Sequence, residues 1–255
     1  DHWRLGSQNR VRFPSIPRDE EAATIAQLVE ILAETPHDHR AKMALPRHHE
    51  FLEMLDAPRW NWDAVVLQSF LDDAKGQASP YFEYAARFAA LAKAQGARVI
   101  LYETTPETQN PFPLAAPPDP DPVETKARAL AGLAERLEAA VVPMSLVALH
   151  CQMERPDLTL RYVNDDHLNQ VMAYLTACTF YAVWCGRSPE GLTLDTVADN
   201  RALDGVHPEK DRDGNPLARV FSAQDRADLQ RFAWEGVAHF RRIRESLRLE
   251  TAEVP

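Results

Sequence analysis

The sequence lacks any long hydrophobic run, since no stretch of about eighteen uninterrupted apolar residues occurs in its 255 residues. No membrane span is therefore predicted, and the chain is expected to be soluble. Cysteine is also scarce, with only Cys151, Cys178 and Cys185. An odd number without Cys-x-x-Cys spacing argues against a disulfide framework and against a zinc ribbon. Because Cys178 and Cys185 lie in an apolar helical stretch, we expect them to be buried free thiols.

Positive charge is in deficit, with 28 Lys and Arg against 38 Asp and Glu and a formal net charge of −10 at pH 7. So acidic a surface repels phosphate backbones, which argues against a nucleic-acid partner. The first residue is Asp1 and not methionine. Removal of a signal peptide, which would indicate a secreted or periplasmic protein, and a trimmed chain are both compatible with this start. The compartment and the oligomeric state stay open.

Three short runs predict buried β-strands at residues 63–68, 97–102 and 140–146. Each is apolar on both faces and rich in β-branched residues, as is typical of parallel strands. Amphipathic helical patterns at 81–95 and 124–137 precede the second and third runs. This alternation predicts an α/β fold with a parallel sheet built from right-handed crossovers.

The flanking segments are less regular. An amphipathic helix is expected over 20–32 and another from about Ser222, its N-cap, to Leu247. Residues 1–5 are a poor candidate for a first strand. Seven prolines in 106–122 predict a stiff surface loop. We find no internal repeat and no second domain, so a single domain over 1–255 is predicted.

The most informative stretch runs from His167 to Leu192. A histidine precedes a long apolar helical pattern, which Gly186 and the pair Ser188-Pro189 close. From the pattern alone His167 opens a buried helix, and a role as the helix cap competes with a catalytic role.

This stretch resembles the last block of SGNH/GDSL hydrolases, in a branch with the motifs Tyr-Leu-x-Ala-Cys and Gly-x-Ser-Pro-x-Gly-Leu after the block histidine. The matching residues are Tyr174, Leu175, Ala177, Cys178, Tyr181, Gly186, Ser188, Pro189, Gly191 and Leu192. Residues 62–69, 96–104 and 229–235 resemble two strands and the closing helix of the same branch. The resemblance covers about residues 60–240. It implies a three-layer α/β sandwich with a mostly parallel, flavodoxin-like central sheet.

The resemblance also implies a serine nucleophile in a Gly-x-Ser turn, activated by the block histidine, here His167. Ser7 is the candidate nucleophile, although it follows Gly6 directly and Gln8 occupies the place of the family serine. Two alternatives stay open. Ser7 can be an ordinary turn residue in a site that has lost its nucleophile, or the true serine preceded Asp1.

The family orients its histidine with an aspartate three residues earlier, which fixes the tautomer and stabilises the charged ring. Asn164 stands at that position here, and Asp165 can take the role if the turn is one residue shorter. Gln68, at the carboxyl end of a predicted strand, is the candidate oxyanion donor. The alternative for Gln68 is a strand-end glutamine that bonds neighbouring backbone.

A second Asp-x-x-His-Pro motif runs from Asp204 to Pro208. A polar turn and not a helix follows it, so we interpret it as a decoy in an insertion loop at about 193–221, with His207 as the alternative base. Residues 211–215, Asp-Arg-Asp-Gly-Asn, resemble a calcium loop, but the closing glutamate is missing at the required distance.

The predicted function is therefore an SGNH-type serine ester hydrolase acting on a small acyl ester. An acetylated carbohydrate as the substrate rests on analogy with the family. No metal or organic cofactor is required. The alternative is a catalytically inactive SGNH-fold binding protein. Gln8, Asn164 and the absence of the glycine that this branch carries five residues after its histidine favour it.

Overall fold

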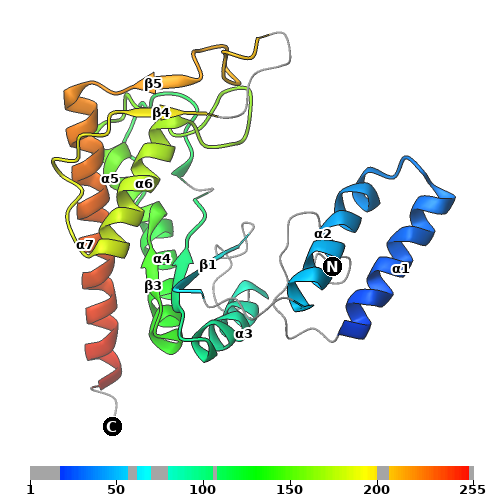
Figure 1. The fold of residues 1–255 in the computed structure, drawn as a ribbon. Helices are drawn as coiled ribbons and strands as arrows, with labels where there is room; N and C mark the ends of the chain where they lie inside the picture. The colour runs from blue at the N-terminus through cyan, green and yellow to red at the C-terminus, as the bar shows by residue number, and fades with distance from the viewer. Residues whose placement is uncertain (1–17, 57–61, 70–79, 106–107, 200–206, 253–255) are drawn as a thin grey trace. The chain divides into compact units, whose positions relative to one another are not determined.

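The computed structural model describes residues 18–56, 62–69, 80–105, 108–199 and 207–252 (Figure 1). Its internal contacts divide the chain into two compact units. The first comprises Asp1–Asp63 with Ala94–Ala97, and the second comprises Ala64–Lys93 with Arg98–Pro255. The described residues form a mixed α/β structure with seven helices and a three-stranded parallel sheet. The single-domain interpretation of residues 1–255 stays a prediction.

The first unit contains two helices that lie side by side, α1 (Arg18–Glu34) and α2 (His39–Asp56) (Figure 1). Leu28 of α1 packs with Ala41 and Ala44 of α2, and this small apolar cluster joins the pair. The helix expected over 20–32 is confirmed. The sequence pattern did not predict α2, whose interior contains Pro46, a residue that normally interrupts helices.

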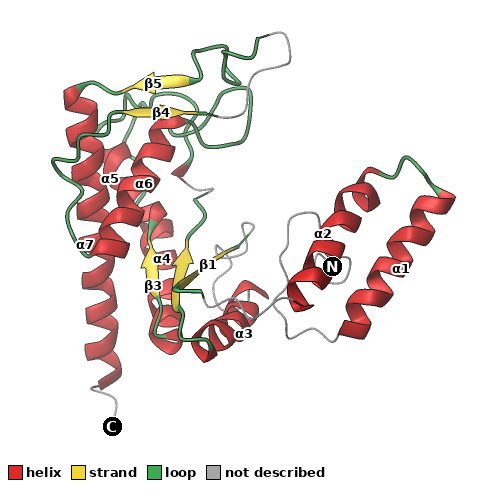
Figure 2. Ribbon diagram, viewed as in Figure 1, coloured by secondary structure: helices red, strands yellow, loops and turns green. Residues whose placement is uncertain are grey.

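Three parallel strands form the sheet of the second unit, in the order β1 (Ala64–Gln68), β2 (Arg98–Tyr102) and β3 (Ala140–Val142) (Figure 2). The first two predicted strands are confirmed. The third was predicted to reach residue 146, and this is wrong. Pro143 ends the strand and α5 (Met144–Glu154) begins directly after it. A continuous apolar run fits a buried strand and a buried helix equally well, so its periodicity could not locate the boundary.

The other helices of this unit end and begin where the sequence places turn residues and caps. Gly96 and Gly186 follow their helices with positive φ angles of 82° and 64°, which a glycine adopts without strain. Ser222 caps the last helix, because its Oγ accepts a hydrogen bond from Asp225 N at 3.0 Å. These helices are α3 (Pro80–Ala94), α4 (Asp121–Leu137), α6 (Gln170–Cys185) and α7 (Ala223–Ala252).

The proline-rich loop and the insertion loop are both partly corrected. Asp121 begins α4, so the predicted loop 106–122 ends two residues early, with Pro122 in the first helical turn, where proline is tolerated. The expected insertion loop contains an antiparallel pair, β4 (Thr196–Ala198) and β5 (Ala218–Val220).

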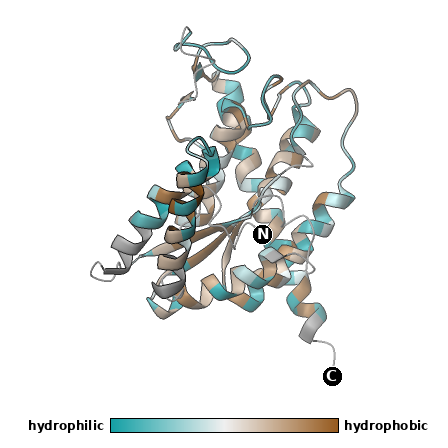
Figure 3. Cartoon of the chain, turned by 90° about the vertical axis from the view of Figure 1, so that its right-hand side faces the viewer, coloured by the Kyte–Doolittle hydropathy of each residue, from teal (hydrophilic) through white to brown (hydrophobic). Residues whose placement is uncertain are grey.

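The core of the second unit lies where the sheet meets α5, α6 and α7. Ile100, Val142, Leu175 and Phe232 are fully buried in one cluster, and Figure 3 shows the strands as strongly hydrophobic segments. α5 and α7 approach so closely that a Cβ on Gly236 would lie 2.5 Å from the side chain of Val147. Only glycine permits this contact.

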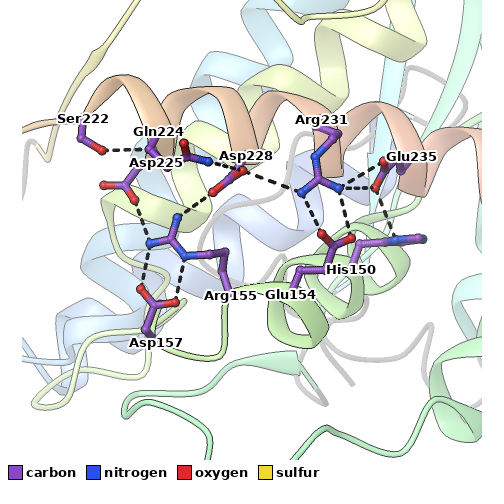
Figure 4. Close-up of polar contacts among 10 residues, drawn as sticks. All are labelled: His150, Glu154, Arg155, Asp157, Ser222, Gln224, Asp225, Asp228, Arg231 and Glu235. Atoms are coloured by element: carbon purple, nitrogen blue, oxygen red, sulfur yellow. Dashed lines mark hydrogen bonds and ion pairs between the residues drawn. The ribbon is translucent and has the colours of Figure 1, made fainter.

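Alongside this apolar contact, charged side chains join α5 to α7 (Figure 4). Arg155 donates to Asp157, Asp225 and Asp228 at 2.8 to 2.9 Å, and Arg231 donates to Glu154 at 2.8 Å and to Glu235 at 3.2 Å. We call this group the interhelical network. Its members are His150, Glu154, Arg155, Asp157, Asp225, Asp228, Arg231 and Glu235.

None of the helices in the described part of the chain combines the length and the apolar character that a membrane crossing requires.

Candidate functional site

His167 lies on the connection between α5 and α6, in a segment that we call the His167 loop, residues 161–168. An antiparallel bridge between Arg161 and Leu168 closes this loop, and Tyr162 N donates to His167 O at 3.1 Å. Asn169 is the N-cap of α6, because its Oδ1 accepts from Val171 N at 3.0 Å and from Met172 N at 3.3 Å. His167 therefore neither opens the helix nor caps it, which corrects both expectations from the pattern.

Asp165 is the carboxylate in contact with the imidazole. Its Oδ1 contacts His167 Nδ1 and also accepts from the backbone N of His167 at 2.8 Å. The Asp165 side chain is 15% exposed, whereas the His167 side chain is 66% exposed. Partial burial acts to raise the pKa of Asp165, but the hydrogen bonds from His167 and the charge of Arg212 outweigh it, so the net pKa lies below its usual range. The carboxylate is therefore ionised at neutral pH.

Asn164, at the position where the family carries its aspartate, faces a different partner. Its backbone N donates to Asp213 Oδ1 at 2.9 Å, and in the described contacts its side chain does not reach the ring of His167. Sequence spacing left Asn164 and Asp165 as alternatives. In the structure, Asp165 and not Asn164 contacts the ring of His167.

The partner of the His167 loop is the segment 211–215, which we call the aspartate turn. Asp211 Oδ1 accepts from Asp213 N at 3.0 Å and from Asn215 N at 2.9 Å, so this side chain closes the turn. Asp213 accepts from Val163 N of the His167 loop at 2.9 Å. Because both carboxylates already bind backbone N–H groups, the segment is a hydrogen-bonded turn and does not present the free carboxylates of a calcium loop.

A cavity of about 240 Å³ adjoins the aspartate turn. Its lining residues are Gln170, Asp211, Asn215, Pro216, Ala218 and Arg219. Because typical sites for drug-sized ligands start at roughly 300 Å³, this space suits only a small group.

Of the other predicted site residues, the structure describes only Gln68 and His207. Ser7 and Asp204 lie outside the described residues. Gln68 is the exposed last residue of β1, paired in register with Tyr102. His207 is exposed. The nucleophile and oxyanion assignments therefore stay predictions, as does the choice of His167 over His207.

Sequence reasoning missed one buried polar cluster at the carboxyl edge of the sheet. Glu103 follows β2 directly, and its Oε2 accepts from Ser145 N at 2.9 Å. Lys126 Nζ lies 3.5 Å from Glu103 Oε1 and 3.4 Å from Ser145 Oγ. All three side chains are buried, and the cluster joins β2 to α4 and α5. No motif in the sequence indicates these contacts.

In the described ranges, no three His, Cys, Asp or Glu side chains are grouped as a metal ion would require. Comparison of the chain with family models, with curated proteins and with solved structures finds no match. The resemblance to SGNH/GDSL hydrolases therefore stays a prediction from the motifs.

Proposed function

We propose that the chain is a serine ester hydrolase of the SGNH type, with His167 as the general base and Asp165 as the group that orients it. The contact between Asp165 Oδ1 and His167 Nδ1 carries this proposal. It occupies one ring nitrogen and leaves an imidazole that is 66% exposed. A carboxylate on Nδ1 is the arrangement that makes Nε2 the proton acceptor.

The proposed chemistry is acyl transfer to a serine. A serine hydroxyl is a poor nucleophile until a base removes its proton, and His167 Nε2 accepts that proton as the ester carbonyl is attacked. The ionised carboxylate of Asp165 stabilises the imidazolium that forms. His167 then donates the proton to the leaving alkoxide, and an activated water hydrolyses the acyl-enzyme. Ser7 is assigned as the nucleophile, with its backbone N–H and Gln68 as oxyanion donors.

The finer parts of the proposal come from the motif resemblance. They are a three-layer sandwich around a flavodoxin-like sheet and a small acyl ester, such as an acetylated carbohydrate, as the substrate. The proposed reaction requires no metal and no organic cofactor.

Hydrolysis of p-nitrophenyl acetate tests the proposal in the wild type and in Ser7→Ala, Asp165→Asn, His167→Ala and His207→Ala. We expect kcat to fall by about 10³-fold or more for Ser7→Ala and His167→Ala, and by a similar order for Asp165→Asn, as in other serine triads. The matched control is His37→Ala, because His37 is exposed in the first unit.

Each outcome separates two assignments. Equal background rates of ester hydrolysis in the wild type and all variants would contradict the proposed esterase activity and favour the alternative, an inactive binding protein. Retained activity in Ser7→Ala alone would show that the nucleophile is wrong. Loss of activity in His207→Ala, with His167→Ala active, would transfer the role of base to His207.

A further inference from the structure

We infer that the aspartate turn is the positioning element of the His167 loop, and that Arg212 and Asp213 are positioning residues for the pair Asp165–His167. The catalytic meaning of this inference rests on the proposed function, whereas the contacts between the two segments are observed independently of it.

Asp213 fixes the backbone of the His167 loop. Its two carboxylate oxygens accept from Val163 N at 3.1 and 2.9 Å, and Oδ1 also accepts from Asn164 N at 2.9 Å. Hydrogen bonds from N–H groups to a charged acceptor are stronger than those between neutral groups. These bonds hold the two residues that directly precede Asp165, so they set the direction from which its carboxylate approaches the ring.

Arg212 acts on the side chain of Asp165. Its Nε lies 3.4 Å from Asp165 Oδ2, the oxygen opposite to the one that contacts His167. This Nε is buried and makes no hydrogen bond to any described residue. The interaction is therefore mainly one of charge, and it favours the rotamer of Asp165 in which Oδ1 faces the imidazole.

The aspartate turn can position the loop because it is itself fixed to the helix core. Asp211 is 2% exposed, and its Oδ2 accepts from the side chain of Gln170, the first residue of α6, at 3.1 Å. Gln170 also donates to Leu217 O at 3.2 Å. The turn thus holds the His167 loop in a fixed place relative to α6. Within the loop, Asp166 forms an ion pair with Arg161.

Two readouts test the inference in Arg212→Ala, Arg212→Lys, Asp213→Ala and Asp213→Asn. The matched control is Glu209→Ala, because Glu209 is exposed and lies two residues before the aspartate turn. The first readout is amide hydrogen exchange at Val163 and Asn164, together with the tautomer of the His167 ring from nitrogen NMR. We expect exchange about tenfold faster in Asp213→Ala, partial rescue in Asp213→Asn, and a loss of Nδ1–H tautomer in Arg212→Ala that Arg212→Lys restores in part. Glu209→Ala should match the wild type.

The second readout is p-nitrophenyl acetate hydrolysis, in which we expect kcat to fall about tenfold in Asp213→Ala and Arg212→Ala with KM nearly unchanged. Unchanged exchange and an unchanged tautomer would overturn the inference, whatever the activity. Faster exchange with an unaltered kcat would also overturn it, because the turn would then be only structural. If the wild type itself hydrolyses no ester, the proposed function fails. The measurements of amide hydrogen exchange and of the ring tautomer then decide by themselves whether the turn positions His167.

Discussion

The interhelical network and the contacts around His167 both contain arginine and carboxylate side chains, but the network joins two packed helices and the His167 contacts lie on a loop. The network joins α5 to α7, which already share a buried apolar contact at Val147 and Gly236. The His167 loop has an exposed histidine, and the aspartate turn supplies its hydrogen bonds from outside the loop. Ion pairs added to a packed core contribute stability, whereas hydrogen bonds to an exposed loop determine its geometry. The predictions below test that difference, from the largest expected effect on stability to the smallest.

The largest effect should come from the core beneath the interhelical network. Phe232→Ala removes a fully buried ring, and we expect the free energy of unfolding to fall by about 3–5 kcal/mol through lost burial and the cavity left behind. Denaturant unfolding followed by circular dichroism measures this. Leu249→Ala on the same helix is the control, because Leu249 is 58% exposed and its loss should change stability by less than about 0.5 kcal/mol. Equal costs for both would show that α7 is not packed as described.

Removal of the central arginine of the network should cost less. Arg155→Ala removes the closer of the two cations beside Asp228, whose side chain is only 12% exposed and which keeps Arg231 at 3.7 Å, so we expect a loss of about 1.5–3 kcal/mol. Arg87→Ala is the comparison, because the pair of Arg87 with Glu83 is exposed and should be worth about 0.3–0.5 kcal/mol. A cost for Arg155→Ala no larger than that of Arg87→Ala would make the network redundant.

His150 of the interhelical network and His239, whose ring lies against it, should make the stability of the protein depend on pH. Burial lowers the pKa of His150, with a further contribution from His239, and burial also lowers the pKa of His239. Below the usual histidine pKa of about 6.5, the unfolded chain binds protons more readily than the folded chain. The free energy of unfolding should therefore fall as pH decreases through that value. Denaturant titrations at several pH values measure the slope.

The double variant His150→Gln/His239→Gln is the control for this slope. It should show a weaker decrease in stability below about pH 6.5, because two groups that resist protonation in the folded state are gone. Glu235, whose Oε2 lies 3.9 Å from His150 Nδ1, acts in the opposite direction and limits the effect. An identical slope in the variant and the wild type would rule out these histidines as its source.

The smallest effect on global stability should come from the aspartate turn. Asp213→Ala should lower the free energy of unfolding by at most about 1 kcal/mol, because the two residues whose N–H groups it accepts, Val163 and Asn164, are themselves exposed. The same denaturant titration measures it beside Arg155→Ala. A cost as large as that of Arg155→Ala would show that the turn is part of the folding core, and the contrast between the two regions would not hold.

The sequence by itself predicted the elements whose signals are local. Apolar runs located β1 and β2, Gly186 marked the end of α6, and Ser222 marked the start of α7. These predictions hold because strand propensity, helix periodicity and capping depend on neighbours within a few positions along the chain.

The tertiary structure decided what those signals could not. The apolar run after Val142 became a helix, and Asp165, not Asn164, met the ring of His167. Both outcomes depend on contacts with distant segments. Asp213 lies 50 positions from Val163, and no local pattern reports which backbone N–H its carboxylate will accept. Local signals determined β1, β2, the end of α6 and the start of α7, and long-range contacts determined the helix after Val142 and which carboxylate stands beside the exposed histidine.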